Sequence, residues 1–75
     1  MNRKHIQELC IAQLNAIIEK EGEDKVFMRS TSVGKNTWTN KEALESVKED
    51  RNLENGPNLI DDYIVLLNWK RDHEC

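Results

Sequence analysis

The sequence predicts a mostly α-helical fold, a small three-helix domain with a polar insertion between the first two helices that could form a short β-hairpin. Apolar residues recur at helical spacing in two segments, a capping box opens a third, and Gly and Pro residues separate them. The 75 residues allow a single domain, residues 1–75. A domain this small buries only about 60% of its unfolded surface, so its stability is marginal without a partner or a cross-link.

The first helix is predicted over residues 3–21, which Gly22 should end with a left-handed cap. Its apolar side is formed by Ile6, Leu9, Cys10, Leu14, Ile17 and Ile18. With Ile11 included, the apolar arc covers about 200°, whereas a surface helix needs about 100°. This helix is therefore expected to contact more than one neighbour.

The polar insertion, residues 25–38, allows two structures. Its β-prone start, the turn-forming Gly34 and the returning segment around Trp38 are typical of a hairpin. Two strands alone are marginal in water, and a coil packed by Phe27, Met28 and Trp38 is an equal alternative.

The second helix is predicted over residues 40–50, on the surface of the domain. Thr39 and Glu42 have the spacing of a capping box, in which each side chain satisfies a backbone amide of the other residue. Trp38 and Ala43 stand at the positions of a hydrophobic staple, which would make Trp38 the residue that closes the entry to the helix.

The third helix is expected to start after Asn58, a good N-cap residue. Asp61 and Asp62 suit the positive start of a helix, and Lys70 and Arg71 suit its negative end. One side of this helix carries Leu59, Ile60, Tyr63, Ile64, Leu66 and Leu67. A buried strand is the rival structure, which the leucines and the acidic first turn disfavour.

Val65 and Trp69 fall outside that arc, so the segment around them is apolar on every side. Such a helix is either the central buried helix of the domain or is covered by another chain. Trp69 could equally belong to an interface or pack inside the molecule.

This apolar excess predicts a small cytoplasmic protein–protein interaction module that acts as a homo-oligomer or as an accessory or regulatory subunit, without catalysis. The expected partner is a protein, either a second copy or another chain. The predicted interface residues lie at or beyond the edges of the intramolecular faces: Ile11, Ile18, Val65 and Trp69.

The alternative is binding of a nucleic acid or a phosphorylated ligand by residues 25–41. This segment carries +4 and no acidic residue, which leaves −7 for the rest of a chain of net charge −3. The predicted contacts are Lys25, Arg29, Lys35 and Lys41, with Trp38 stacking on a base. A solvated loop that balances an acidic body explains the same residues, and we favour it.

A phosphate loop is excluded, although residues 29–35 read RSTSVGK. Arg29 occupies the place of the first glycine, and Asn36 replaces the hydroxyl residue that would contact magnesium.

The residues also give no reason to expect a metal, a cofactor or a catalytic centre. His5, Cys10, His73 and Cys75 lack the spacing of zinc ligands, and Cys10 is expected in the core. Neighbouring carboxylates such as those of residues 61–62 diverge by about 100° on a helix. No segment resembles a secretory signal or a membrane span, so we expect a cytoplasmic protein that does not enter a membrane.

Overall fold

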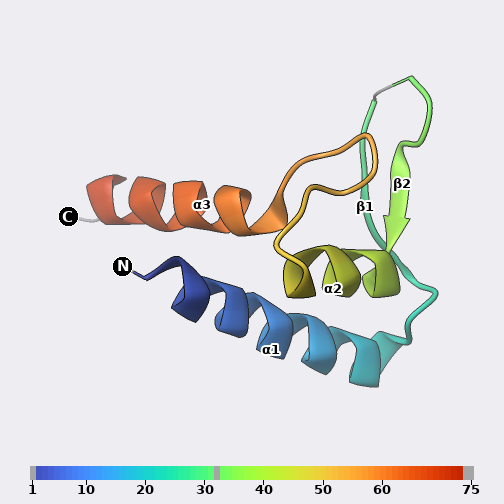
Figure 1. Cartoon of the computed structure of the whole chain (residues 1–75), viewed down its shortest axis with the longest axis horizontal. Coiled ribbons are helices and arrows are strands. Elements are labelled where there is room, and N and C mark those ends of the chain that lie inside the picture. Colours follow the sequence, from blue (N-terminus) through green and yellow to red (C-terminus); the bar gives the residue numbers. More distant parts are fainter. Residues whose placement is uncertain (1, 32, 74–75) are drawn as a thin grey trace.

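The computed structural model describes residues 2–31 and 33–73 and has the predicted mostly α-helical architecture. Figure 1 shows three helices, with a small antiparallel hairpin beside the second of them. The order along the chain is α1 (Arg3–Glu21), β1 (Val26–Arg29), β2 (Thr37–Thr39), α2 (Asn40–Lys48) and α3 (Leu59–His73).

Helix α1 has the predicted bounds, and each end satisfies backbone groups that the helix leaves unpaired. The side chain of Asn2 accepts a hydrogen bond of 2.9 Å from the amide of Lys4. The Gly22 amide donates to the carbonyl of Ile18 at 2.8 Å. Gly22 has φ +94° and ψ 161°, so its positive φ suits glycine, but the expected left-handed cap is wrong in ψ.

The polar insertion forms the hairpin rather than the coil. β1 and β2 pair antiparallel, with Met28 opposite Trp38 and Arg29 opposite Thr37. The register shifts between Val26 and Met28, and the intervening Phe27 packs against the core. The hairpin is therefore stabilised by the helices that it contacts, as two strands alone would not be.

Helix α2 begins with the predicted capping box. The Thr39 hydroxyl accepts from the Glu42 amide, and the Glu42 carboxylate accepts from the Thr39 amide, both at 3.3 Å. The segment before the hairpin satisfies further amides, because Asn40 donates to the carbonyl of Lys25. The side-chain amide of Asn40 also donates to the Gly22 carbonyl, which fastens the start of α2 to the end of α1.

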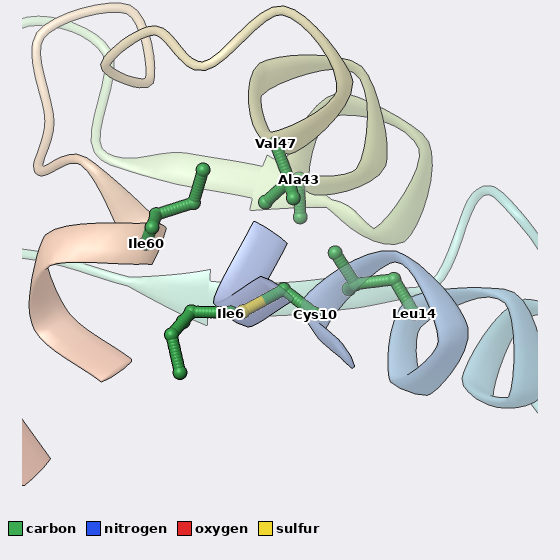
Figure 2. Close-up of a cluster of buried hydrophobic side chains, with 6 residues drawn as sticks. All are labelled: Ile6, Cys10, Leu14, Ala43, Val47 and Ile60. Atoms are coloured by element: carbon green, nitrogen blue, oxygen red, sulfur yellow. The ribbon is translucent and has the colours of Figure 1, made fainter. Parts of the chain in front are cut away.

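The core lies where the three helices meet (Figure 2). Its buried apolar residues are Ile6, Cys10, Leu14, Ala43, Val47 and Ile60. Cys10 is a buried core residue, as the sequence predicts. Helix α2 ends at Lys48 rather than residue 50, and its buried Asn40 and Ser46 make it less of a surface helix than its apolar pattern suggests.

Trp38 forms a second buried site, between the hairpin and the loop that follows α2. Its side chain is fully buried, and its indole N–H donates to the Glu54 carbonyl at 2.9 Å. A Cβ atom added at Gly56 would lie 2.7 Å from the indole ring and 3.2 Å from Leu53. Glycine at position 56 therefore makes room for Trp38.

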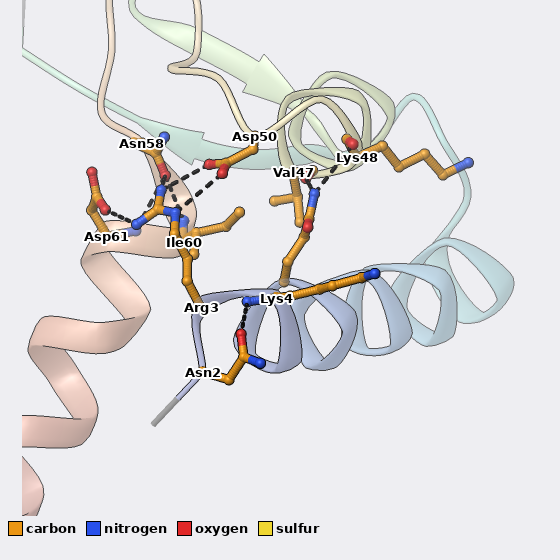
Figure 3. Close-up of polar contacts among 10 residues, drawn as sticks. Asn2, Arg3, Lys4, Val47, Lys48, Asp50, Asn58, Ile60 and Asp61 are labelled. Atoms are coloured by element: carbon orange, nitrogen blue, oxygen red, sulfur yellow. Dashed lines mark hydrogen bonds and ion pairs between the residues drawn. The ribbon is translucent and has the colours of Figure 1, made fainter.

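Arg3 connects the start of α1 to the turn that follows α2 and to the start of α3 (Figure 3). Its guanidinium holds the Asp50 carboxylate with two hydrogen bonds, of 2.8 and 3.1 Å, and also pairs with Asp61 at the start of α3. The hydrogen bonds from Arg3 lower the pKa of Asp50 below its ordinary value of 3.8, and the two carboxylates raise the pKa of Arg3.

Helix α3 begins as predicted, because the Asn58 side chain accepts from the amides of Ile60 and Asp61. It is not the central buried helix, and that alternative is wrong. Throughout α3, all of which the structure describes, Ile60 is the one fully buried residue. Figures 1 and 3 show its later turns running away from α2 and the hairpin.

Changing Gly56 to Ala should lower the free energy of unfolding by about 1–3 kcal/mol, because the added methyl group overpacks the Trp38 site. Chemical denaturation monitored by circular dichroism measures this loss. Glu54→Ala, at an exposed side chain nearby, should change the same quantity by less than about 0.5 kcal/mol. Equal effects of the two substitutions would contradict the packing argument.

The ion pair between Arg3 and Asp50 should make the free energy of unfolding depend on pH. The pKa of Asp50 is lower when folded than when unfolded, so the unfolded state binds more protons, and this contribution is lost as the pH falls below the ordinary value of 3.8 and through the lowered pKa of the folded state. Arg3→Met should therefore flatten the fall of the melting temperature over this range. Arg29→Met should leave it unchanged, and parallel melting curves for Arg3→Met and wild type would contradict the assignment.

Candidate functional site

The candidate site is an apolar groove of about 230 Å³ between α1 and α3. Its walls come from all three helices and from β1: Cys10, Gln13, Leu14, Ile17, Phe27, Val47, Leu59, Asp62, Tyr63 and Leu66. Three of these residues, Gln13, Asp62 and Tyr63, carry polar side-chain groups in an otherwise apolar lining. Such a groove suits an apolar side chain with a few polar contacts at its edge.

Helix α1 supplies the floor of the groove. Cys10 and Leu14 are buried, and Ile17 is half-buried one turn further along. Burial raises the pKa of the Cys10 thiol, which favours the neutral form. Cys10 therefore contributes a small apolar wall rather than a reactive thiolate.

One hydrogen bond links the two helices across the groove. The side-chain amide of Gln13 donates to the hydroxyl oxygen of Tyr63 at 3.3 Å. Together with the core contact of Ile60, this bond fixes the first turns of α3 beside α1.

A strip of exposed apolar side chains continues from the groove along α3. We define the α3 strip as Val65, Leu66 and Trp69, whose residues are 65%, 47% and 56% exposed. Leu66 belongs to both features, because it also lines the groove. The strip and the groove are therefore one continuous apolar surface.

Trp69 is held in place by its own helix. Its ring stacks on that of His73 with centroids 4.3 Å apart and planes 18° from parallel. The His73 ring nitrogen Nδ1 also lies within hydrogen-bond distance, 2.8 Å, of the Trp69 carbonyl oxygen. A large aromatic ring is thus presented to solvent in a fixed orientation.

The four predicted interface residues do not form one surface. Val65 and Trp69 lie in the α3 strip, whereas Ile11 and Ile18 are half-buried on α1. Ile11 and Ile18 follow Gln7 by four and eleven residues, so they share its side of the helix. Gln7 donates to the Val47 carbonyl at 2.8 Å, so this side of α1 faces α2.

The sequence placed Leu66 and Leu9 on the inner sides of their helices, but both are exposed at 47% and 39%. For Leu66 a signal was present, because it lies at the edge of its apolar arc, about 60° from Trp69. Leu9 carries the same signal, because it lies at the edge of the apolar arc of α1, about 40° from Gln13.

The predicted basic segment is partly neutralised by acidic residues outside it. Lys35 forms a 2.8 Å ion pair with Glu42, and the pKa of Glu42 is lowered mainly by this hydrogen bond. Lys25 lies 3.6 Å from Glu21, while Arg29 and Lys41 are exposed.

Trp38 cannot stack on a base in this structure, which corrects the role given to it in the nucleic-acid alternative. Its ring is fully buried, so neither face is open to a ligand. It occupies the entry to α2, as a staple residue would, with its indole N–H directed to the Glu54 carbonyl.

Within residues 2–31 and 33–73, no group of three or more His, Cys, Asp or Glu side chains is arranged to hold a metal ion. Cys75, one of the four His and Cys residues of the sequence, lies outside this range. In the same part of the chain, no helix combines the length and apolar character needed to cross a bilayer.

Neither family models, nor curated proteins, nor solved structures provide a match for this chain.

The two tryptophans should differ sharply in their access to solvent. Trp69→Phe leaves only the buried Trp38, so fluorescence in dilute solution should shift to shorter wavelength and acrylamide quenching should fall several-fold. Trp38→Phe should leave a readily quenched emission from Trp69. Equal quenching of the two single-tryptophan variants would contradict the placement of Trp69 at the surface.

Proposed function

We propose that this protein is a small cytoplasmic protein–protein interaction module, which docks through the α3 strip and the adjoining groove. It acts as a homo-oligomer or as an accessory or regulatory subunit, and it carries out no catalysis. The observation that carries the proposal is the continuity of the two apolar features at Leu66.

The α3 strip has no role in the protein's own core. The core receives Ile60 from α3, with half-buried support from Leu59, Tyr63, Ile64 and Leu67, and none of the three strip residues is among them. Contiguous apolar surface of this kind usually marks an interaction site, whereas scattered apolar residues need no explanation.

Trp69 has the properties of an anchor residue. Tryptophan is enriched among the residues that dominate binding energy, and a side chain already fixed in position loses little conformational entropy on binding. The stack on His73 supplies this fixation before any partner arrives.

The carboxylates of Asp61 and Asp62 have roles in folding and in the groove that do not require catalysis. Asp61 forms an ion pair with Arg3 at the start of α3, and Asp62 lines the groove. A groove of about 230 Å³ is also smaller than the pockets of about 300–1,000 Å³ that usually hold small molecules.

Binding of a nucleic acid or a phosphorylated ligand has less support. The burial of Trp38 removes the predicted stacking residue, and two of the four basic side chains pair with acidic ones. Arg29 and Lys41 remain exposed, which is ordinary for a solvated hairpin.

A photo-cross-linking amino acid at position 65, in the middle of the α3 strip, tests the proposal in the native host. We expect one defined covalent adduct, with a protein or with a second copy of this chain, because Val65 lies beside the proposed contact. The adduct should disappear when Leu66 and Trp69 are both changed to Ser.

The matched control is the same amino acid at Asn15, an exposed position on the outer side of α1. Irradiation of that variant should give no defined adduct. If position 65 gives none either, or if its adducts survive the two serine substitutions, the proposed docking surface is wrong.

A further inference from the structure

We propose that the α3 strip pairs with the same strip of a second copy of this chain. In this pair the two α3 helices lie antiparallel, and Leu66 of each copy packs against Trp69 of the other. The inference rests on the proposed function, since it names the partner that the docking surface takes.

The exposed residues of α3 have the spacing of a helix–helix seam. Asp62, Leu66, Trp69 and His73 follow one another at intervals of four, three and four residues. Such spacing places all four within an arc of about 60° on the helix surface. All four are exposed in the single chain, so the seam is open to a second helix.

The charges along this seam favour an antiparallel copy. The seam begins with Asp62 and ends near Lys70 and His73. Antiparallel pairing brings the acidic start of one helix beside the basic end of the other, whereas parallel pairing brings like charges together. Among the described residues, neither Asp62 nor Lys70 has an ion-pair partner within its own chain.

One register satisfies the apolar and the charged residues together. When Leu66 lies opposite the partner's Trp69, Asp62 lies opposite the partner's His73, because each is four residues further from the centre. The partner's Lys70 then lies within about one helical turn of Asp62. In this arrangement, each copy contributes the same Leu–Trp contact and the same charge pair.

The groove fits this register as well. Leu66 and Asp62 both line it, so a Trp69 side chain packed against Leu66 from outside stands beside the groove. Its 230 Å³ are lined mainly by apolar atoms, which suits an indole ring. Each copy supplies one Trp69 and one groove, so the contact is isologous and closes at two chains.

The arrangement leaves room for both bodies. The later turns of α3 run away from α2 and the hairpin (Figure 1). In an antiparallel pair, the core of each copy therefore lies beside the C-terminal half of the other copy's α3. The two cores then lie at opposite ends of the pair.

Sedimentation equilibrium of the purified full chain, over a range of concentrations, tests the pairing. We expect wild type to pass from one chain to two. Asp62→Lys and Lys70→Glu should each weaken this association by about tenfold or more, because like charges then face each other across the pair. An equimolar mixture of the two variants should restore it, since position 62 of one chain and position 70 of the other then carry opposite charges again.

The control variant is Glu19→Lys, which makes the same kind of charge reversal on the outer side of α1 and should associate as wild type does. Circular dichroism confirms that each variant is folded. Trp69→Ser should abolish association both alone and in the mixtures. If charge reversal has no effect, or the mixture fails to recover, the antiparallel pairing is wrong.

This experiment separates the two proposals. A wild-type chain that stays monomeric at several hundred micromolar overturns the pairing. If position 65 nevertheless forms a defined adduct with a different protein in cells, the docking surface stands with another partner. A monomer that also forms no adduct overturns both.

Discussion

Helix α3 gives the core one fully buried residue, Ile60 in its first turn, and this constraint determines what the rest of the helix can do. Ile60 is the last fully buried apolar residue of the described chain, and thirteen further residues of α3 follow it. Residues 2–31 and 33–73 contain no additional element to place over them. The apolar side chains of the α3 strip are therefore left without intramolecular cover, although the sequence places large residues there.

The polar contacts reinforce this division of α3. Arg3 and the Asn58 cap hold the beginning of the helix, and the bond between Gln13 and Tyr63 adds one contact a turn later. These bonds lie at the start of α3, where they fix its direction relative to α1 and shape the groove. The second half of the helix is helical and remains accessible, as a docking element requires.

Local signals in the sequence predict where the helices begin, but they predict poorly which side chains of those helices are buried. The capping box of Thr39 and the cap at Asn58 act over a few residues, so the pattern contains everything needed to place these helix starts. The exposure of Leu66 and the burial of Trp38 depend on segments far away in the chain. In the basic segment, the turn of the hairpin brings Lys35 to Glu42 of α2, a pairing that residue spacing alone does not predict. A helical wheel shows which sides are apolar, but it does not show which of them the rest of the chain covers.

The contrast between the two tryptophans shows why the exposed surface calls for a partner. For Trp38 the chain supplies a complete site: a carbonyl acceptor at Glu54, a glycine at position 56 that leaves room for the ring, and the packing of Leu53. For Trp69 it supplies a single stacked ring, that of His73, one turn away on the same helix. That stack orients the indole without removing its apolar surface from water. Burying the Trp69 ring would therefore be favourable, and a second protein that covers α3 would be stabilised on it by that burial.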